Sequence, residues 1–289
     1  MEYLEAFRLK YQYDDPLADL RVPFVEEYFK PYLPEALGNG LNHIHEIVFV
    51  ILLYHAIFVI ARIVFKILWP NYKISQNLLN EFGIHVVSFI QSIIILIMLI
   101  PALQNPYLEN DRVFGYTPYS GLLTSFAVGY FIWDAIISIL YSAFGFFLHG
   151  LTSSIVFGIG LTPYIMYYSP IFLLFELSNP FLNLRWFGIK FPGSFSAIFQ
   201  LINNIILITI FFFMRIGWGW YQVFRLALDF YQVRNDPRFN LTYSIIILVC
   251  NFILDILNVY WFYRMVLVAI RILKQMFCSK KETESKKKI

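Results

Sequence analysis

Long stretches without charged residues constrain this chain more than any other feature. No Asp, Glu, Lys or Arg occurs from Phe82 to Leu103, and only one, Asp134, occurs from Tyr119 to Phe175. A helix crosses a bilayer with about 20 mostly apolar residues, at a rise of about 1.5 Å each. The chain is 59% hydrophobic and 14% charged, whereas soluble domains carry about 25% charge. We therefore predict an all-α, polytopic membrane protein, and exclude a soluble enzyme, a disordered chain and a disulfide-stapled secreted domain.

The hydrophobic pattern divides the chain into three regions. Residues 1–46 form a polar-aromatic tail that is either interfacial or loosely folded, residues 47–271 form a transmembrane domain, and residues 272–289 form a basic tail. If the short fifth apolar segment is re-entrant, six spans cross the membrane; otherwise seven do. The predicted spans lie near residues 47–69, 82–103, 119–140, 142–161, 163–178, 195–218 and 241–264.

Lysines cluster after the last span, between Lys274 and Lys288. Basic residues in short flanks mark the cytosolic side of a membrane protein, so we expect a cytosolic C-terminus. Seven spans then place the N-terminus on the opposite side, whereas six place both ends in the cytosol. The net charge of +3 is too small to indicate a nucleic-acid partner.

The last four residues read Lys-Lys-Lys-Ile, with Lys286 and Lys287 fourth and third from the end. This pattern resembles the dilysine signal by which coat machinery returns membrane proteins to the endoplasmic reticulum. The alternative is a nonspecific basic tail that binds anionic lipid. A glycosylation sequon, Asn240-Leu241-Thr242, adjoins the last span, so its use stays open.

Polar residues interrupt several predicted spans, where an ionisable group costs about 2.5–3.5 kcal/mol on insertion scales. Asp134 and His149 flank the turn near Tyr141, which places both about 10–12 Å from the cytosolic end. Helices that each bring a polar group to the inner half of the membrane favour one shared polar cavity. The alternative is a set of separate interhelical hydrogen bonds. For Asp255, the alternatives are a pairing with a neighbouring helix or a contact with Arg264 through water. The residues concerned are Asp134, His149, Glu176, Asn179, Asn203, Asn204 and Asp255.

Three motifs resemble the TLC domain family, named for TRAM, Lag1 and CLN8 proteins. They are Gly-Tyr-Phe-Ile-Trp-Asp at 129–134, Phe-Phe-Leu-His-Gly around His149, and Glu-Leu-Ser-Asn-Pro-Phe-Leu-Asn-Leu-Arg-Trp at 176–186. The last motif is the most specific and resembles the TLCD4-like branch, which includes uncharacterised fungal members. The resemblance implies an endoplasmic-reticulum protein with a six-helix ring around a central cavity and one extra N-terminal transmembrane helix.

Ceramide synthases of this family use a histidine pair and an aspartate pair to transfer an acyl group from acyl-CoA to a sphingoid amine. By position, the histidine pair falls on Leu148 and His149, and the aspartate pair on Glu176 and Asn179. Each pair is therefore incomplete, and the resemblance leaves enzyme activity open.

The closing motif also has a local physical interpretation. A residue before proline disfavours the helical region, so we expect Pro180 to end the fifth helix. Arg185 and Trp186 then form an interfacial anchor. Alternatively, Arg185 pairs with Glu176 or binds a lipid phosphate.

Two functions follow from these observations. The first is the binding of a membrane lipid or acyl chain, with influence on lipid composition or traffic. The second is acyl-CoA-dependent acyl transfer, with His149 as general base oriented by Asp134 or Glu176. The sequence shows no metal cluster, phosphate loop or nucleophile elbow, so we expect no metal and no cofactor. For lipid binding, the candidate contacts are Asn179, Arg185, Asn203, Asn204 and Asp255.

Overall fold

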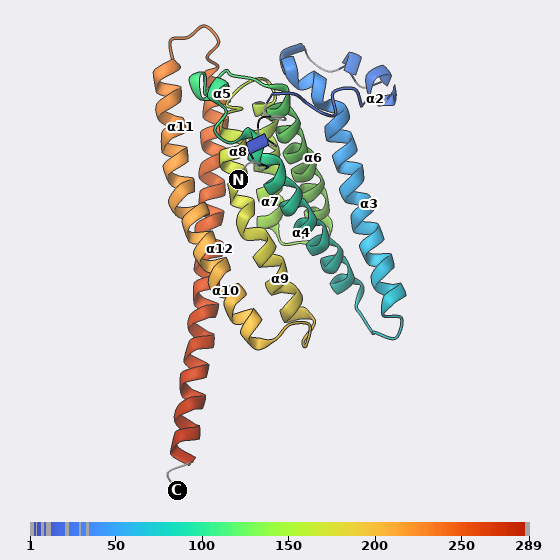
Figure 1. Ribbon diagram of the computed structural model, residues 1–289, viewed down its shortest axis with the longest axis vertical. Coiled ribbons are helices and arrows are strands. Elements are labelled where there is room, and N and C mark those ends of the chain that lie inside the picture. Colours follow the sequence, from blue (N-terminus) through green and yellow to red (C-terminus); the bar gives the residue numbers. More distant parts are fainter. Residues whose placement is uncertain are drawn as a thin grey trace.

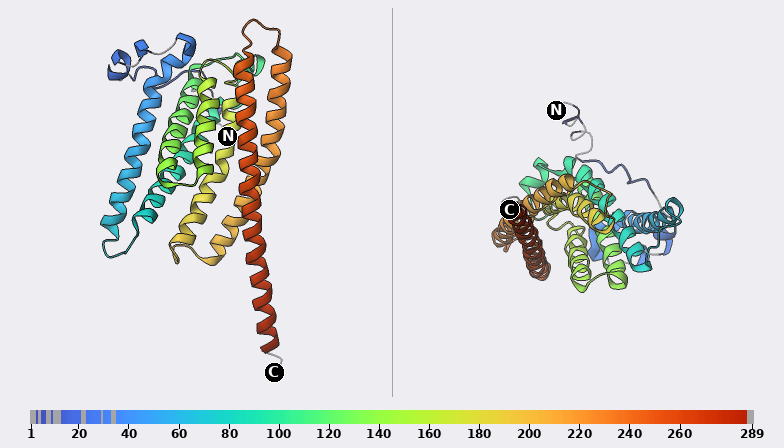
Figure 2. Two further views of the ribbon diagram at one scale, coloured as in Figure 1. Left: turned by 180° about the vertical axis from the view of Figure 1, so that it is seen from behind. Right: turned by 90° about the horizontal axis from the view of Figure 1, so that it is seen from below.

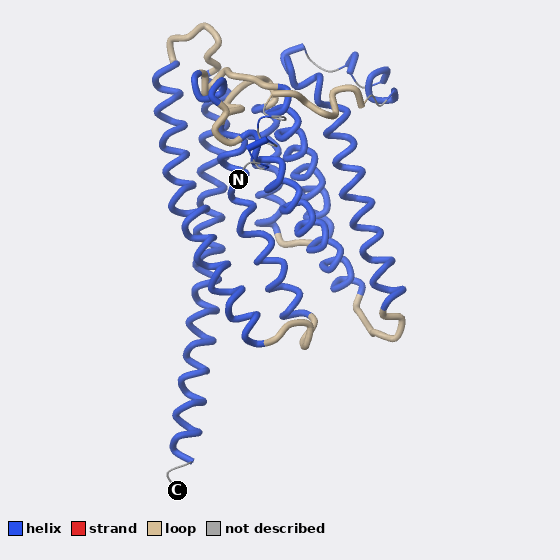
Figure 3. Tube along the Cα trace, viewed as in Figure 1, coloured by secondary structure: helices blue, strands red, loops and turns tan. Residues whose placement is uncertain are grey.

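The computed structural model contains helices and connecting loops, and no strand occurs among the residues that it describes (Figure 3). These are residues 3, 5, 6, 9, 13–20, 23–28, 30–32 and 35–286, without the side chains of residues 26, 30, 35–37 and 272–286. Lys287 and the end of the predicted retrieval signal lie outside this range, as does the Lys286 side chain. The prediction of an all-α polytopic membrane protein is confirmed.

The helices follow one another in a single series (Figure 1). Short elements cover one end of the bundle: α2 (Pro23–Tyr28), η1 (Lys30–Tyr32), η2 (Glu35–His43) and α5 (Pro106–Asn110). The elements that build the bundle are α3 (Ile44–Leu68), α4 (Gln76–Ala102), α6 (Pro118–Tyr141), α7 (Phe144–Gly160), α8 (Tyr168–Leu173), η3 (Leu174–Ser178), α9 (Asn179–Lys190), α10 (Ala197–Phe211), η4 (Phe212–Trp218), α11 (Gly219–Val233) and α12 (Leu241–Lys286).

Five of these helical stretches are long and apolar enough to cross a membrane, which makes the chain a multi-pass membrane protein. They are Gly38–Leu68, Gln76–Ala102, Pro118–Tyr141, Ala197–Val233 and Leu241–Arg271. Helix α7 is apolar but shorter. The segment from α8 to α9 runs through the bundle toward its far end instead of turning back (Figure 1).

Local sequence explains where several helices begin. The Ser75 hydroxyl accepts a hydrogen bond from the Leu78 amide at 3.2 Å and caps α4. Thr117 caps α6 in the same way, and Pro118 follows at the first helical position. Such caps satisfy backbone N–H groups that have no partner inside the helix. They fix the start of each helix beside a short connection.

Six helical segments form a closed ring. In order around the ring these are α4, α6, α7, α12, α10 with η4, and α9 with η3, and α9 returns to contact α4. Helix α3 lies outside the ring against α4 and α6. A six-helix ring with one extra N-terminal helix is the architecture implied by the resemblance.

Helix α6 is the most enclosed member of the ring, because α3 covers its outer side. Of its most apolar 18-residue window, 78% is buried, compared with 17% for α3. Gly150 lets α7 approach α6 closely: a Cβ atom at this position would lie 2.8 Å from the Ala135 amide nitrogen. Small residues at such crossings permit tight packing between helices in a membrane.

Several helix boundaries differ from the expectation, and α12 continues to Lys286 instead of ending near residue 264. Pro180 does not end the fifth helix, because it occupies the first turn of α9, where its missing N–H costs nothing and its fixed φ suits a helix. The helical chain therefore continues to Lys190. The sixth helix likewise passes its expected end near residue 218 through the π-helical segment η4 and continues as α11 to Val233.

The first and last long helices place their free ends at opposite ends of the bundle. Helix α3 begins at the end covered by α2, whereas α12 extends well beyond the opposite end (Figures 1 and 2). The chain thus reverses direction from one long helical stretch to the next, as the seven-span alternative describes.

Candidate functional site

A cavity of about 570 Å³ lies inside the ring. All six ring segments contribute side chains to it, and α3 contributes none. Its wall contains His85 and Ser88 from α4, Asp134 from α6, His149 from α7, Glu176 and residues of α9, Arg215 from η4, and Trp261 and Arg264 from α12. A volume of this size is in the range of small-ligand sites.

Five of the residues predicted from the sequence line this cavity: Asp134, His149, Glu176, Asn179 and Arg185. The ring thus brings residues from three of its segments to one space. Their roles in binding or chemistry stay predictions.

The other three predicted residues do not line the cavity. Asn203 donates to the Phe181 carbonyl at 2.8 Å, and Asn204 accepts from Arg185 Nη1 at 2.9 Å. Asp255 lies beside Gly219, where an added Cβ atom would be 3.7 Å from its Oδ1. Asn203 and Asn204 therefore match the alternative of interhelical hydrogen bonds, and Arg185 forms its polar contact with Asn204.

Arg215 is the centre of the polar wall, and sequence reasoning missed it. Its side chain is 4% exposed. It donates from Nε to Ser178 Oγ at 3.0 Å, from Nη2 to Asn179 Oδ1 at 2.8 Å, and from Nη1 to Asn258 Oδ1 at 3.3 Å. The signal was present, because Arg215 lies inside the predicted sixth span, where an ionisable group already indicates a site.

Asn179 connects this arginine to a buried acid. Its amide nitrogen donates to Glu176 Oε2 at 2.7 Å, while its oxygen accepts from Arg215. Among the described residues, Arg215 has no carboxylate oxygen within 4.0 Å. The amide at this position therefore has a clear structural purpose: it satisfies an anionic and a cationic group at once, which a carboxylate could not do.

The two chain segments that carry this cluster depart from regular α-helical geometry. Glu176 and Ser178 belong to the tight 3₁₀ segment η3, and Arg215 belongs to the wide π-helical segment η4. Short π-helical stretches are rare and occur often at functional sites. Here the wider turn carries the buried arginine.

His149 faces the same space without an acid to orient it. Its Nδ1 is buried and has no hydrogen-bond partner. Its ring packs edge-on against Phe131 and Trp261, each with a centroid separation of 5.6 Å. No hydrogen bond joins His149 to Asp134 or Glu176 within the described part of the chain, so the expected orienting contact is absent there.

The closing motif presents one helical face to the cavity. The face also carries Asn183, whose Oδ1 accepts a hydrogen bond from His85 Nδ1 at 2.7 Å and whose amide nitrogen donates to Ser88 Oγ at 3.1 Å. Trp186 stacks on the His85 ring with centroids 4.1 Å apart. The motif therefore joins α9 to α4 across the ring, and His85 is a second wall residue that the sequence analysis did not select.

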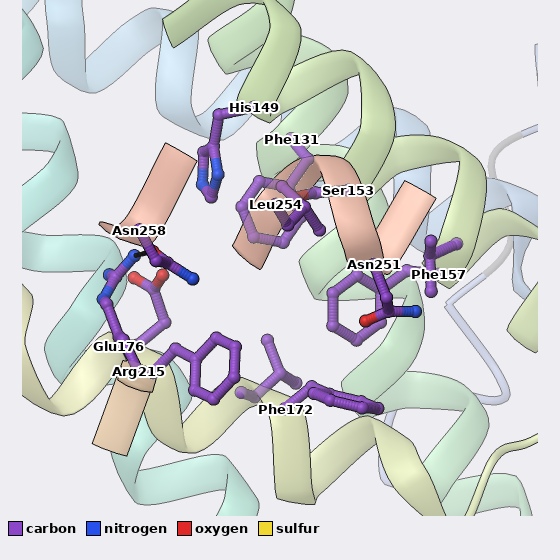
Figure 4. Close-up of a pocket in the computed structure, with 13 residues that line it drawn as sticks. Phe131, His149, Ser153, Phe157, Phe172, Glu176, Arg215, Asn251, Leu254 and Asn258 are labelled. Atoms are coloured by element: carbon purple, nitrogen blue, oxygen red, sulfur yellow. Dashed lines mark hydrogen bonds between the residues drawn. The ribbon is translucent and has the colours of Figure 1, made fainter. Parts of the chain in front are cut away.

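A smaller pocket of about 40 Å³ shares His149, Glu176 and Arg215 with the large cavity (Figure 4). Figure 4 shows Glu176, Arg215 and Asn258 close together, with His149 directed toward the same space. The rest of this pocket is mostly apolar and aromatic, with Phe131, Phe157, Phe172 and Leu254 in its wall. Apolar lining thus begins directly beside the polar cluster.

Exposed side chains mark where the large cavity reaches the surface. Tyr141, Ala143 and Phe146 at the α6–α7 turn line it and are exposed, as is Arg264 on α12. We call these four residues the mouth of the cavity. The mouth combines aromatic rings with one cation, which is the composition found at a membrane interface.

The sequence of the ring also matches a known protein family. The family model of the TLC domain matches residues 81–267 of the chain. This range includes at least the greater part of every ring segment and every residue of the polar cluster described above. No solved structure matches the chain.

Several known proteins are similar along most of the chain. An uncharacterised TLC domain-containing protein of Saccharomyces cerevisiae is 47% identical over 213 residues, which cover 70% of this chain and 68% of the relative. Topoisomerase I damage affected protein 4 of the same species is 32% identical and covers 86% of this chain and 92% of its own length.

A human relative supports the branch suggested by the closing motif. TLC domain-containing protein 4 of Homo sapiens is 29% identical over 160 residues, or 53% of this chain and 60% of the relative. The family match, the fungal relatives and this relative agree, and the chain belongs to the TLC domain family.

Proposed function

We propose that this protein binds a membrane lipid in the cavity of its helical ring and thereby influences membrane lipid composition or traffic. The observation that carries the proposal is the cavity itself. It is a space of about 570 Å³ inside a membrane bundle, with a buried polar cluster on its wall and a mouth lined by aromatic rings. A lipid would match both the polar cluster and the aromatic lining of this cavity. Its polar head group would lie at Arg215 and Glu176, and its acyl chain along the aromatic wall.

The charge of the cavity wall narrows the class of lipid. Three acids and three arginines line it, namely Glu81, Asp134, Glu176, Arg185, Arg215 and Arg264. Arg215 and Glu176 are already linked through Asn179. A balanced wall favours a zwitterionic or neutral polar head group, because a head group with net charge would need an unmatched partner in a low-dielectric site.

A cavity-blocking substitution tests lipid binding. Ala143→Trp fills the mouth without touching the polar cluster, and Phe144→Trp places the same ring on the neighbouring residue, which is 71% exposed and does not line the cavity. We expect one lipid class to co-purify with the wild-type protein and with Phe144→Trp, and to fall several-fold in Ala143→Trp, as measured by mass spectrometry of extracted lipid.

Equal amounts of that lipid in both variants would contradict the proposal. So would a co-purified mixture with the composition of the surrounding membrane. Comparing the lipids of cells with and without the protein then identifies the class that it affects.

The unpaired imidazole supports a second candidate, acyl transfer from acyl-CoA. In that reaction the nitrogen of a lipid amine attacks the thioester carbonyl and His149 accepts the amine proton. The C–S bond then breaks, and His149 gives this proton to the departing thiolate. His149 lines the cavity with a free Nδ1. Purified protein incubated with acyl-CoA and a sphingoid base distinguishes the two functions: product that disappears in His149→Ala supports the enzyme.

We further propose residence in the endoplasmic reticulum, with a cytosolic C-terminus recognised by coat machinery. The support is the position of Lys286 and Lys287 at the end of the chain. Changing both to serine is expected to move a tagged protein from the endoplasmic reticulum to later compartments, as seen by fluorescence microscopy. Lys280→Ser with Lys281→Ser removes the same charge elsewhere in the tail and should leave the location unchanged.

A further inference from the structure

A second polar cluster lies at the end of the bundle where α3 begins, far along the helices from the cavity mouth (Figure 1). It contains Asp15, His43 and Glu46, and one potential ligand atom from each lies within 4.8 Å of the other two. His43 and Glu46 are 2% and 0% exposed. The cluster joins the N-terminal segment to the first turn of α3.

One carboxylate oxygen of this cluster has no N–H or hydroxyl donor. Glu46 Oε1 is buried and accepts no such hydrogen bond, although its other oxygen has two contacts of this kind; the Asp15 carboxyl group is the other hydrogen-bonding group beside Glu46. A buried carboxylate oxygen without a donor costs free energy that a second ligand could recover. The nearest cationic candidate is His45 Nε2 at 3.7 Å, which is engaged with the Leu17 carbonyl at 3.2 Å.

Surrounding residues hold the three side chains in place. His43 Nδ1 lies 2.9 Å from Glu46 Oε2, and His43 Nε2 lies 2.8 Å from the Tyr116 hydroxyl. The Ser125 hydroxyl donates to Glu46 Oε2. Gly121 provides room for the imidazole, because a Cβ atom there would overlap the His43 ring.

We propose that Asp15, His43 and Glu46 bind a divalent transition-metal ion, with Zn²⁺ as the representative ion. Imidazole nitrogen and carboxylate oxygen are common zinc ligands, and a site with three protein ligands keeps one position for water. Two carboxylates and a neutral imidazole balance the charge of the ion. Such neutrality matters because both Glu46 and His43 are buried.

The hydrogen bonds around His43 are compatible with metal binding. When Nε2 carries the proton and donates it to Tyr116, Nδ1 has a lone pair for the ion. A metal ligand histidine typically donates its second nitrogen in this way. In the ion-free protein, one proton lies in the hydrogen bond between Nδ1 and Glu46 Oε2. Binding releases this proton to solvent and replaces the hydrogen bond by two metal bonds.

This site is independent of the lipid-binding proposal. None of its three residues lines the large cavity. The ion would instead fasten the N-terminal segment to the end of η2 and the first turn of α3. Failure of lipid binding leaves the metal proposal standing, and the reverse also holds.

Metal content and thermal stability test the proposal on the full chain purified in detergent. After loading with Zn²⁺ and desalting, we expect about one zinc per chain by mass spectrometry. Saturating zinc should raise the Tm by about 5 °C over the EDTA-treated protein. Asp15→Asn should lose most of the bound zinc, whereas Asp14→Asn, the exposed neighbouring carboxylate, should retain it.

A gentler variant guards against loss of folding. Tyr116→Phe keeps all three ligands and removes only the partner of His43 Nε2, so zinc affinity should fall by about 10–100-fold while the EDTA-treated Tm changes little. Three results would overturn the assignment: no retained zinc in the wild-type protein, equal losses in Asp14→Asn and Asp15→Asn, or a preference for Ca²⁺ over Zn²⁺.

Discussion

A single buried arginine organises the polar wall of the cavity. Arg215 donates to residues of η3, α9 and α12 at once, which links three segments of the ring. Asn179 carries the connection onward to Glu176. The polar side chains of the closing motif thus hold helices of the ring together. Their hydrogen bonds within the protein are already formed before a lipid head group binds.

Removal of the guanidinium is expected to destabilise the protein strongly. Arg215→Met keeps the approximate length of the side chain but removes three hydrogen bonds, so that Ser178, Asn179 and Asn258 lose their donor. Because each buried polar group left without its partner costs about 1–3 kcal/mol, we expect a loss of about 3–5 kcal/mol. The measurement is the free energy of unfolding in mixed detergent micelles.

Arg264→Met serves as the control, because Arg264 is exposed at the mouth. Its substitution should change the free energy of unfolding by less than about 1 kcal/mol. Equal effects of the two substitutions would show that Arg215 does not organise the wall.

At the scale of helices, close packing and local irregularity place the site. Helices α6 and α7 approach one another at Gly150, and this close approach places the neighbouring His149 beside α6. On the opposite wall, η3 and η4 interrupt regular α-helix where Glu176 and Arg215 lie. The positions of Glu176 and Arg215 therefore depend on these two irregular segments and would differ in a regular α-helix.

Two alanine substitutions in α7 should have opposite effects. Alanine favours a helix over glycine by up to about 1 kcal/mol, so Gly158→Ala, whose Cβ atom would meet nothing within 4 Å, should stabilise the protein slightly. Gly150→Ala should destabilise it by about 1–3 kcal/mol, because the added methyl group overlaps the α6 backbone. Unfolding curves of both variants decide the point, and a stabilised Gly150→Ala would refute the close approach.

At the scale of the whole molecule, the ring encloses the cavity and α3 stays outside it. The chain passes up and down the bundle, so the loop at residues 191–196 and the loop at residues 234–240 lie at opposite ends (Figures 1 and 2). The mouth of the cavity therefore lies toward the end of the bundle that carries the 191–196 loop and the C-terminus. We propose that this end faces the cytosol.

Cysteine labelling in sealed microsomes tests this path. With Cys278→Ser as background, Ser194→Cys should react with a membrane-impermeant maleimide added from the cytosolic side. Asn235→Cys should react only after detergent opens the vesicles. The remaining Cys250 is buried and supplies the background control. Reaction of both introduced cysteines in sealed vesicles would rule out the alternating arrangement.

The membrane class, the family and much of the polar wall follow from the amino-acid sequence alone. Runs of about 20 apolar residues without charge indicate helices in lipid, because every backbone polar group there must be satisfied within the segment. Asp134, His149 and Glu176 were selected because polar groups in such helices need a partner or a cavity, and Asn179 and Arg185 belong to the closing motif.

Which of the selected residues share a space depends on how the helices pack against one another. Asn203 and Asn204 lie at a similar depth to the cavity residues, yet hydrogen-bond to Phe181 and Arg185. Depth along a helix follows from residue number, whereas the side to which a residue points depends on helix rotation, and the π turn at η4 alters that rotation. The cluster of Asp15, His43 and Glu46 was likewise hidden, since it forms only when a distant segment folds back on α3.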